Sequence, residues 1–573
     1  MSDRAITPQT NVSAQAERKS LAIFSGRRGL KRREAVLAYL FLSPAIIIIG
    51  LFGLFPLVFS VYQSTRAGLN NVVGRPDGLG QYVRAMDNLA YVFAFWMAAF
   101  FVLVAVRQIN ELLSAARAKD ENPWRWLLPG ALSAAGLALL LWFIFTFMPG
   151  LLEIGEKLVG FTAEERNELF SQFLREAWTT TGAASLFYYG VLTLILSGVA
   201  YFFVQRNSPP TLRDSFYTGK LTTAVFLTIT AAALVWLTYG EIQAAYAEAL
   251  EAGEALAIWA QVVTISAGFV LLLISWLVWR TAAHRDSNLQ TGLRFFAAIL
   301  LMVGGWVLIS ELPVAIAAGD EDWWIGLRTT LYYVIGTLPA ELGFGLVLAT
   351  LLYQEIKGKG LFRMIYFLPY ITPAVGAAAV FKVLFSGNPT GTMNLVLASL
   401  GFQPLGWLNE PNGINQIIAE AFNTTVPAWA AGPSLALIVA IIFGIWKFTG
   451  YNVVFFLAGL GNISREYYEA ASMDGAGRWA QFRHITLPLL SPITYFLTIF
   501  GVIGTFKAFN TIFVLRSRAA LGTMDTASLV IFDAFNRDTR IGYAAALGIV
   551  LLIVILSATA LLDRVAKGRV FYG

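Results

Sequence analysis

The chain has 573 residues, of which 57% are hydrophobic and only 13% are charged, whereas about 25% of the residues of a soluble protein are charged. A soluble body of this size would lack the polar surface it needs, so the composition indicates an integral membrane protein and argues against a cytosolic enzyme. The absence of Cys excludes disulfides, thiol catalysis and Cys-ligated metal centres.

Twelve apolar runs are long enough for membrane-spanning helices, because a bilayer core of about 30 Å needs about 20 apolar residues per helix. In chain order they are 36–61, 89–106, 126–148, 181–204, 221–239, 258–279, 295–314, 327–353, 364–385, 433–459, 489–512 and 541–562. Sheets with open edges cannot cross a bilayer. The expected fold is therefore an all-α integral membrane protein with about twelve transmembrane helices.

The distribution of Lys and Arg sets the orientation, because these residues are retained on the cytoplasmic side. With the N-terminus inside, 27 of the 41 Lys and Arg residues fall in cytoplasmic segments, and the other 14 fall in external segments or within spans. Acidic residues divide the other way, with 13 in cytoplasmic segments and the other 22 in external segments or within spans. Both termini are therefore expected in the cytoplasm. Because the basic residues follow the membrane topology, no nucleic-acid partner is expected.

The N-terminal tail, residues 1–35, is basic and places five Lys and Arg residues just before the first span. This pattern is typical of a topology signal that is also attracted to anionic membrane lipid. The span that follows, within residues 36–64, is too long for the core of a signal peptide and lacks a small-residue cleavage site after it. We expect it to remain as an uncleaved anchor.

One polar loop differs from the other predicted cytoplasmic loops. In it, Ser464 is a suitable N-cap, and Glu466 and Glu469 in the first turns suit the positive end of a helix. Gly475 is expected to end this helix after two to three turns. The helix is too polar to enter the membrane, yet it carries apolar side chains. A partner's groove is therefore expected to bury it.

The same loop, residues 461–488, carries a spacing that resembles a known family. The signature loop of permease subunits in binding-protein-dependent ABC importers is matched in full by Glu469, Ala470, Ala471, then Gly475 directly after Asp474, and then Ile485, Leu487 and Pro488. Further segments are similar to the carbohydrate-uptake branch, and to its larger maltose-type permease: 39–44, 328–333, 367–370, 446–450, 455–460, 505–509 and 542–546. The resemblance covers roughly half of the chain.

The resemblance implies a type I importer with a six-helix core in this chain, a second permease subunit, an ATPase dimer and an extracytoplasmic solute-binding protein. It implies the cytoplasmic (inner) membrane of a prokaryote, and a transporter subunit rather than an enzyme. The loop helix would dock into a cleft of the ATPase and transmit its closure to the membrane helices; the alternative is a plain connector on the membrane surface. A sugar or polyol is the implied substrate, and a glycerol phosphate-type solute is the alternative.

Residues 65–325 interrupt the resemblance. They hold six of the twelve spans, between the first core helix, 36–64, and the remaining core, 326–573. Because six is an even number, the insertion preserves the sidedness of the spans that follow, and we expect it to be separable from the transport cycle. Its external segments are acidic, which fits either a solvated face or a contact with the binding protein.

A charge within a membrane span is costly, and four of the charged residues within the predicted spans are candidates for a specific role: Glu341, Lys382, Lys447 and Lys507. For Lys382 and Lys447 three interpretations stay open, namely extension towards the membrane interface, pairing with another charge, and a role with substrate.

A candidate substrate path starts from Lys507, which lies within one turn of Thr505 and Asn510. These three side chains would offer hydrogen-bond donors to sugar hydroxyls if they face the bundle interior. On the preceding span, Trp446 and Tyr451 would supply apolar ring faces for stacking on sugar rings, or would serve packing alone.

Other chemistry finds no support in the sequence. It contains no Gly-rich loop of the GxxxxGK[ST] kind, so ATP and Mg²⁺ are expected on partner ATPases and no cofactor on this chain. His284 and His484 are far apart in sequence, so no metal site is expected. An ion-coupled secondary transporter would show two parallel six-span halves, and a lipid-linked glycosyltransferase would need an acidic catalytic cluster near an external loop. Both classes fit less well than the permease.

Overall fold

The computed structural model describes residues 27–68, 74–208, 215–253, 256–282 and 288–570. The chain divides into two compact units, residues 1–62 and 63–573. The first unit contains α2 (Arg27–Ile49), a π-helical segment (Gly50–Leu54) and most of α3 (Phe55–Ser64). Most of the predicted basic tail, residues 1–26, lies outside the described residues.

The second unit begins with a two-stranded antiparallel ribbon, in which β1 (Arg66–Ala67) pairs with β2 (Arg75–Pro76). The helices of the predicted insertion follow: α4 (Gly80–Met86), α5 (Leu89–Ala118), α6 (Leu127–Lys157), α7 (Ala163–Thr180), α8 (Ala183–Arg206), α9 (Ser215–Ala252), α10 (Ile258–Ala282) and α11 (Asn288–Ala318). Helix α9 packs on both α5 and α6, α6 also packs on α8, and α10 packs along α11.

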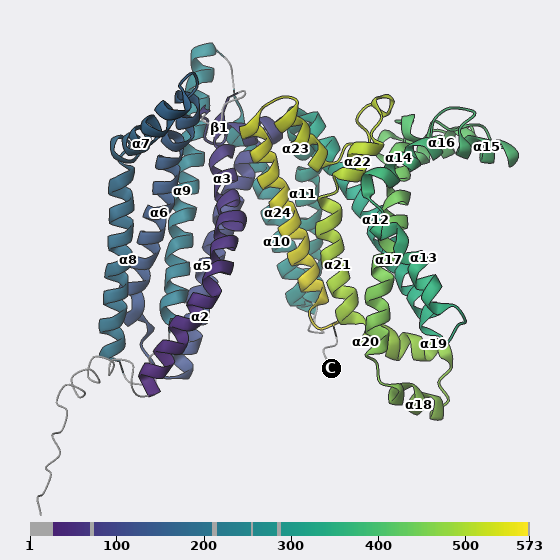
Figure 1. The fold of residues 1–573 in the computed structure, drawn as a ribbon, viewed down its shortest axis with the longest axis horizontal. Helices are drawn as coiled ribbons and strands as arrows, with labels where there is room; N and C mark the ends of the chain where they lie inside the picture. Colours follow the sequence, from purple (N-terminus) through teal and green to yellow (C-terminus); the bar gives the residue numbers. More distant parts are fainter. Residues whose placement is uncertain (1–26, 69–73, 209–214, 254–255, 283–287, 571–573) are drawn as a thin grey trace, which may run out of the picture. The chain divides into compact units, whose positions relative to one another are not determined.

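The remaining helices of the second unit include five long or paired spans and several short connecting helices. They are α12 (Glu321–Tyr353), α13 (Lys359–Ile371), α14 (Ala374–Leu384), α15 (Thr392–Ser399), α16 (Ile414–Ala421), α17 (Leu435–Gly461), α18 (Arg465–Met473), α19 (Arg478–Gln481), α20 (Leu487–Leu489), α21 (Ser491–Phe506), α22 (Asn510–Leu515), α23 (Ala527–Asn536) and α24 (Ile541–Ala566). Helices α15, α16 and α23 lie at the end of the second unit opposite α18 and the C-terminal end of α24 (Figure 1).

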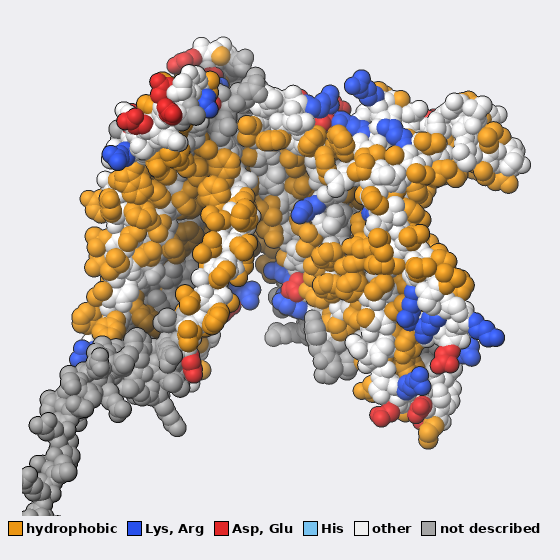
Figure 2. Space-filling model, viewed as in Figure 1, with side chains coloured by type: hydrophobic (Ala, Val, Ile, Leu, Met, Phe, Trp, Pro, Cys, Tyr) orange, Lys and Arg blue, Asp and Glu red, His pale blue; other side chains and the backbone are white. Residues whose placement is uncertain are grey.

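Each of the twelve predicted spans corresponds to a helix or a bent helix pair. Among the described residues, ten helices are long and apolar enough to cross a membrane by themselves, and two bent pairs bring the count to twelve. Hydrophobic side chains cover the visible sides of the helices, and charged side chains gather mainly at their ends (Figure 2). The structure therefore confirms a helical membrane protein with ten to twelve spans.

Two predicted spans are not continuous helices. The span predicted at 364–385 is α13 and α14, which meet at an angle of 91°. Pro373 lies directly after the break, and a proline both lacks an N–H donor and disfavours helical geometry in the residue before it. In the other bent pair, α21 makes an angle of 60° with the segment before it and ends at Phe506, within the span predicted at 489–512.

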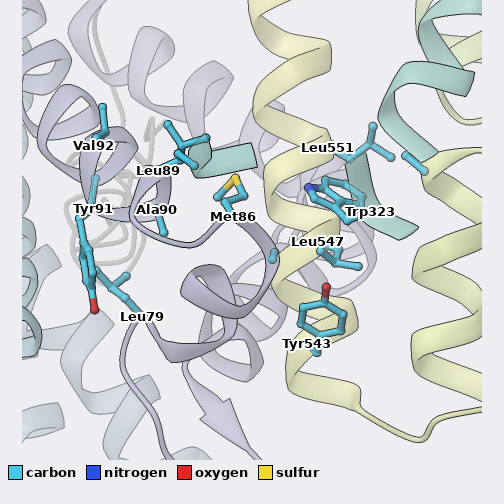
Figure 3. Packing of buried hydrophobic residues seen from close by; sticks show 14 of the residues in the cluster. Leu79, Met86, Leu89, Ala90, Tyr91, Val92, Trp323, Tyr543, Leu547 and Leu551 are labelled. Atoms are coloured by element: carbon cyan, nitrogen blue, oxygen red, sulfur yellow. The ribbon is translucent and has the colours of Figure 1, made fainter. Parts of the chain in front are cut away.

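The largest hydrophobic cluster joins the insertion to the C-terminal helices. Leu79 and Met86, beside and within α4, belong to the same buried cluster as Trp323 on α12 and Leu547 on α24 (Figure 3). Trp323 is fully buried. Part of the insertion therefore shares a core with the helices that follow it.

Candidate functional site

The polar loop that carries the signature spacing forms the helix that the sequence predicts. Helix α18 begins after Ser464, whose hydroxyl oxygen accepts a hydrogen bond from the N–H of Glu466 (3.4 Å). Gly475 has φ +79°, and its N–H donates to the carbonyl oxygen of Ser472 (3.1 Å). The N–H of Ala476 donates to the carbonyl oxygen of Ala471 (2.8 Å). These two bonds form a Schellman motif, so Gly475 ends the helix as expected.

One face of α18 is fastened to the spans. The hydroxyl of Tyr468 lies 3.0 Å from that of Thr486, and the ring packs with Ile485 against the buried cluster around Val453, Phe456 and Leu460. The loop is therefore attached to α17 and to the chain leading into α21 by a hydrogen bond and by apolar contact.

The other face of the loop is exposed and partly apolar. Tyr467, Met473 and Trp479 are exposed by 58%, 88% and 71%. Of the signature residues, Glu469, Ala470, Asp474, Leu487 and Pro488 are also exposed, whereas Ala471 and Ile485 are half-buried. A polar helix that is anchored on one side and shows large apolar side chains on the other is suited to bind a partner protein.

The break between α13 and α14 is stabilised by Lys447, whose role could not be decided from the sequence. Lys447 on α17 is 7% exposed, and its Nζ donates to the carbonyl oxygens of Pro369 (3.3 Å), Tyr370 (3.4 Å) and Thr372 (2.8 Å). These carbonyls lie at the C-terminal end of α13, where they have no partner within the helix and where the helix dipole favours a cation. Lys447 thus satisfies groups that the break exposes.

Lys382 makes a similar contact elsewhere. Its Nζ donates to the carbonyl oxygens of Val514 (3.2 Å) and Arg516 (3.1 Å), at the C-terminal end of α22. Within the described residues, no carboxylate pairs with Lys382 or with Lys447. Both intramembrane lysines therefore bind backbone oxygens rather than a charged side chain, an interaction that no sequence motif indicated.

Close backbone approach fixes α13 on α17 next to the break. A Cβ atom at Gly450 would lie 1.9 Å from the carbonyl oxygen of Tyr366, so only glycine fits there without movement of α13. Beside this contact, the ring of Tyr451 lies 4.9 Å from that of Tyr370 and 6.1 Å from that of Phe500 on α21. Tyr451 therefore lies where α13, α17 and α21 meet.

The structure does not bring the residues of the predicted substrate path into contact with one another. The Thr505 hydroxyl donates to the carbonyl oxygen of Gly501 (2.8 Å) within its own helix. Lys507, directly after α21, and Asn510, the first residue of α22, are both exposed. The ring of Trp446 packs against that of Phe381 on α14 (5.3 Å). Within the described residues, no hydrogen bond or ring contact joins Lys507 or Asn510 to the two aromatic residues. The substrate path stays a prediction.

The fourth charged residue predicted within a span, Glu341, lies at a junction of three helices. Its side chain on α12 is 4% exposed, and its Oε2 makes no hydrogen bond within the described residues. A Cβ atom at Gly501 of α21 would lie 3.6 Å from Oε1. One turn further along α12, a Cβ atom at Gly345 would lie 2.8 Å from the Cβ of Asn452 on α17. A carboxyl group is therefore enclosed where α12, α17 and α21 pack closely.

At the end opposite α18, Arg516 holds the segment between α22 and α24 together. Its guanidinium donates to Asp525 (2.5 Å) and Asp533 (2.7 Å), and Arg537 pairs with Asp533 (3.2 Å). Burial raises the pKa of Asp525, and Arg516 offsets part of this shift. Sequence spacing did not indicate this network, because its members become neighbours only when the loop folds back.

Comparison with known proteins places the chain in a family. Residues 341–570 match the sequence profile described as "Binding-protein-dependent transport system inner membrane component". The chain is 31% identical over 264 residues to the arabinooligosaccharides transport system permease protein AraP of Bacillus subtilis, covering 46% of this chain and 77% of the relative. The chain belongs to this family of inner membrane transport permeases, and it is a multi-pass membrane protein.

Two further relatives and one solved structure show the range of similar proteins. The lactose transport system permease protein LacF of Rhizobium radiobacter is 32% identical, with 42% of this chain and 74% of the relative covered. The sn-glycerol-3-phosphate transport system permease protein UgpA of Agrobacterium fabrum is 29% identical, with 44% and 79% covered. A chain of a bacterial alginate ABC transporter is 23% identical, with 43% and 79% covered and a TM-score of 0.37.

Proposed function

We propose that this chain is the permease subunit of a type I ABC importer that passes a sugar or related polyol across the cytoplasmic membrane. It would pair with a second permease subunit, receive substrate from an extracytoplasmic binding protein and be driven by an ATPase dimer that binds ATP and Mg²⁺. The observation that carries this proposal is the α18 loop, which combines the complete signature spacing with one face fastened to the spans and an exposed face that carries large apolar side chains.

The α18 loop supports a mechanical link between ATP hydrolysis and the spans. ATP-driven closure of two ATPases moves membrane helices only through an element that contacts both. Tyr468 and Ile485 fix the loop to the cluster of α17, while Met473 and Trp479 remain free to fill a groove on the partner. We infer that α18 lies on the cytoplasmic side, together with both chain termini.

The substrate class is proposed from the relatives. Two of the proteins described above are named for arabinooligosaccharide and lactose transport, which supports a carbohydrate. A glycerol phosphate-type solute is the second candidate, because UgpA is named for sn-glycerol-3-phosphate transport. The binding protein would make most of the selection.

Uptake of radiolabelled solutes by cells with and without this chain tests the proposal. We expect loss of uptake of one sugar or polyol in the deletion strain and restoration by the intact gene, with glycerol 3-phosphate uptake unchanged. Pull-down of the tagged chain in detergent should recover an ATPase and a second permease. Recovery of neither, together with unchanged uptake of every solute, would remove the importer assignment.

A further inference from the structure

A basic pocket of about 490 Å³ is lined by residues of the β1–β2 ribbon, of α4 and of the start of α24. Strand β1 lies at the end of the second unit opposite α18 (Figure 1). Four arginines from the ribbon, α4 and the start of α24 line the pocket together with two other polar side chains: Arg66, Arg75, Arg84, Arg540, Gln81 and Tyr543. The pocket brings together segments that are more than 450 residues apart in the sequence.

Aromatic contact holds two of the guanidinium groups in place. The guanidinium carbon of Arg540 lies 5.0 Å from the ring centroid of Tyr543, and that of Arg84 lies 6.0 Å from it. The Tyr543 hydroxyl donates to Asp320, which fixes the ring. A cation over a tyrosine face is stabilised by the ring quadrupole, so part of the pocket is organised without a bound ligand.

The acidic residues near the pocket leave two of its arginines without an ion pair, and one of these carboxylates, Asp320, accepts a hydrogen bond from Tyr543. Asp538 pairs with Arg540, and Asp77 accepts a hydrogen bond from Gln81 Nε2 (2.6 Å). In the part of the chain that the structure describes, no carboxylate lies within salt-bridge distance of Arg75 or Arg84. One arginine of the pocket is therefore matched by a carboxylate while two others have none.

This concentration of arginine runs against the charge pattern of the chain. Counted between the predicted spans, external acidic residues outnumber external basic ones by 20 to 10, and four of those ten basic residues line this single pocket. Like charges in close proximity repel one another. A pocket in which two of these arginines, Arg75 and Arg84, have no carboxylate within salt-bridge distance among the described residues is suited to an anion.

We propose that the arginine pocket binds a phosphate-type oxyanion. The planar guanidinium group donates two parallel hydrogen bonds to a phosphate and carries a permanent charge, and two unmatched arginines suit the one or two negative charges of a phosphodiester or phosphomonoester. Arg540 directly precedes the spanning helix α24, which puts the pocket at the level where lipid headgroups meet water. The phosphate belongs either to a lipid headgroup or to a soluble phosphate ester.

The test uses the full-length chain and removes the two unmatched charges at the rim. The variant Arg75→Gln/Arg84→Gln is compared with Arg175→Gln/Arg518→Gln, which removes two exposed arginines of the same predicted side outside the pocket. Arg75→Lys/Arg84→Lys keeps the charge and loses the forked geometry. Size-exclusion profiles and thermal unfolding in detergent confirm that each variant is folded.

Two measurements distinguish the sources of phosphate. Native mass spectrometry counts phosphatidylglycerol retained by the chain after transfer from nanodiscs that also contain phosphatidylcholine, and thermophoresis titrates inorganic phosphate and glycerol 3-phosphate. We expect the Gln variant to show at least a 10-fold decrease in either lipid retention or phosphate-ester affinity. The Lys variant should show a smaller decrease in the same quantity, and the matched control should equal wild type. Loss of lipid retention would show that the bound phosphate belongs to a lipid headgroup. Loss of solute binding would show that it belongs to a soluble phosphate ester.

Three results would overturn the proposal. They are absence of both kinds of binding in the wild-type chain, equal binding by the pocket variant and the matched control, and a pocket variant whose only defect is weaker association with a binding protein. The last result would assign the pocket to acidic side chains of a protein partner. The phosphate site does not depend on the transported substrate, so it stands or falls separately from the proposed function.

Discussion

The Nζ of Lys447 lies 2.8 Å from the carbonyl oxygen of Thr372, the last residue before the proline that separates α13 from α14. Two further carbonyls of α13 share the same ammonium group. A broken helix inside a membrane needs partners for the backbone groups it exposes. Lys447 supplies them from a neighbouring helix and so couples the position of the break to α17.

Replacing Lys447 by Met should loosen the break while leaving the spans in the membrane. The change removes donors from three carbonyls, at a cost of about 1–2 kcal/mol for polar contacts within a bilayer. We expect faster hydrogen exchange at residues 366–372 and reduced uptake, with partial retention in Lys447→Arg. Lys382→Met is the matched control and should leave exchange in that segment unchanged. Equal exchange in both variants would show that Lys447 does not hold the break.

Glycine 475 should be required for its backbone geometry rather than for space. It has φ +79° and no neighbouring atom within 4 Å of an added Cβ, so Gly475→Ala should cost about 1 kcal/mol through φ alone. Gly475→Asp adds a carboxylate at the negative end of α18 and should abolish uptake at wild-type membrane abundance. Gly477→Ala is the control, because that glycine has φ −69° and equal space. If the Gly475→Asp variant took up substrate at the wild-type rate, the α18 loop would be only a connector between spans.

A bulky side chain on α18 should separate the ATPase from the spans. Ala471 is half-buried on the helix that carries the signature, so Ala471→Trp should overpack a close helix contact whereas Ala471→Ser should be tolerated. Copurification of the ATPase and its stimulation by the binding protein measure the effect. Retention of both by the Trp variant would place the partner on another surface.

Replacing Glu341 by Gln should leave the unfolding temperature equal to or above that of wild type. The side chain is enclosed by α12, α17 and α21, and an amide of the same shape avoids burying a charge within the membrane. Glu341→Lys should prevent stable expression, since a longer cation does not fit there. Glu420→Gln, at an exposed position on α16, is the control. A drop of several degrees in Glu341→Gln alone would indicate that the ionised carboxylate is part of the fold.

Cysteine labelling should establish which side each loop faces, because the chain contains no Cys of its own. Asn412 and Ser472 are both exposed and lie at opposite ends of the second unit, so each is a suitable position for a single Cys substitution. A membrane-impermeant thiol reagent added to intact cells should label Asn412→Cys and not Ser472→Cys. After permeabilisation both should react. The reverse pattern in intact cells would invert the proposed topology.

Several features of this protein were determined by the sequence itself. Long apolar runs must become helices in a bilayer because only a helix satisfies its own backbone there, so the ten continuous spans could be located from their apolar runs. Ser464 and Gly475 act on their immediate neighbours, so the bounds of α18 could be predicted as well. The signature spacing in the same loop was enough to indicate the family.

Tertiary structure decided where distant groups meet. The 91° break was placed by Pro373, but its stabilisation came from Lys447, about 75 residues later in the chain, and hydropathy shows only that such a lysine is costly. Packing also joined Met86 of the insertion to Leu547 of α24 in one buried cluster, so deletion of the insertion would expose a core that span counting treats as separate. Arginines scattered from Arg66 to Arg540 became one pocket for the same reason: the contacts that give each charge its role are set by helix packing, which local sequence does not specify.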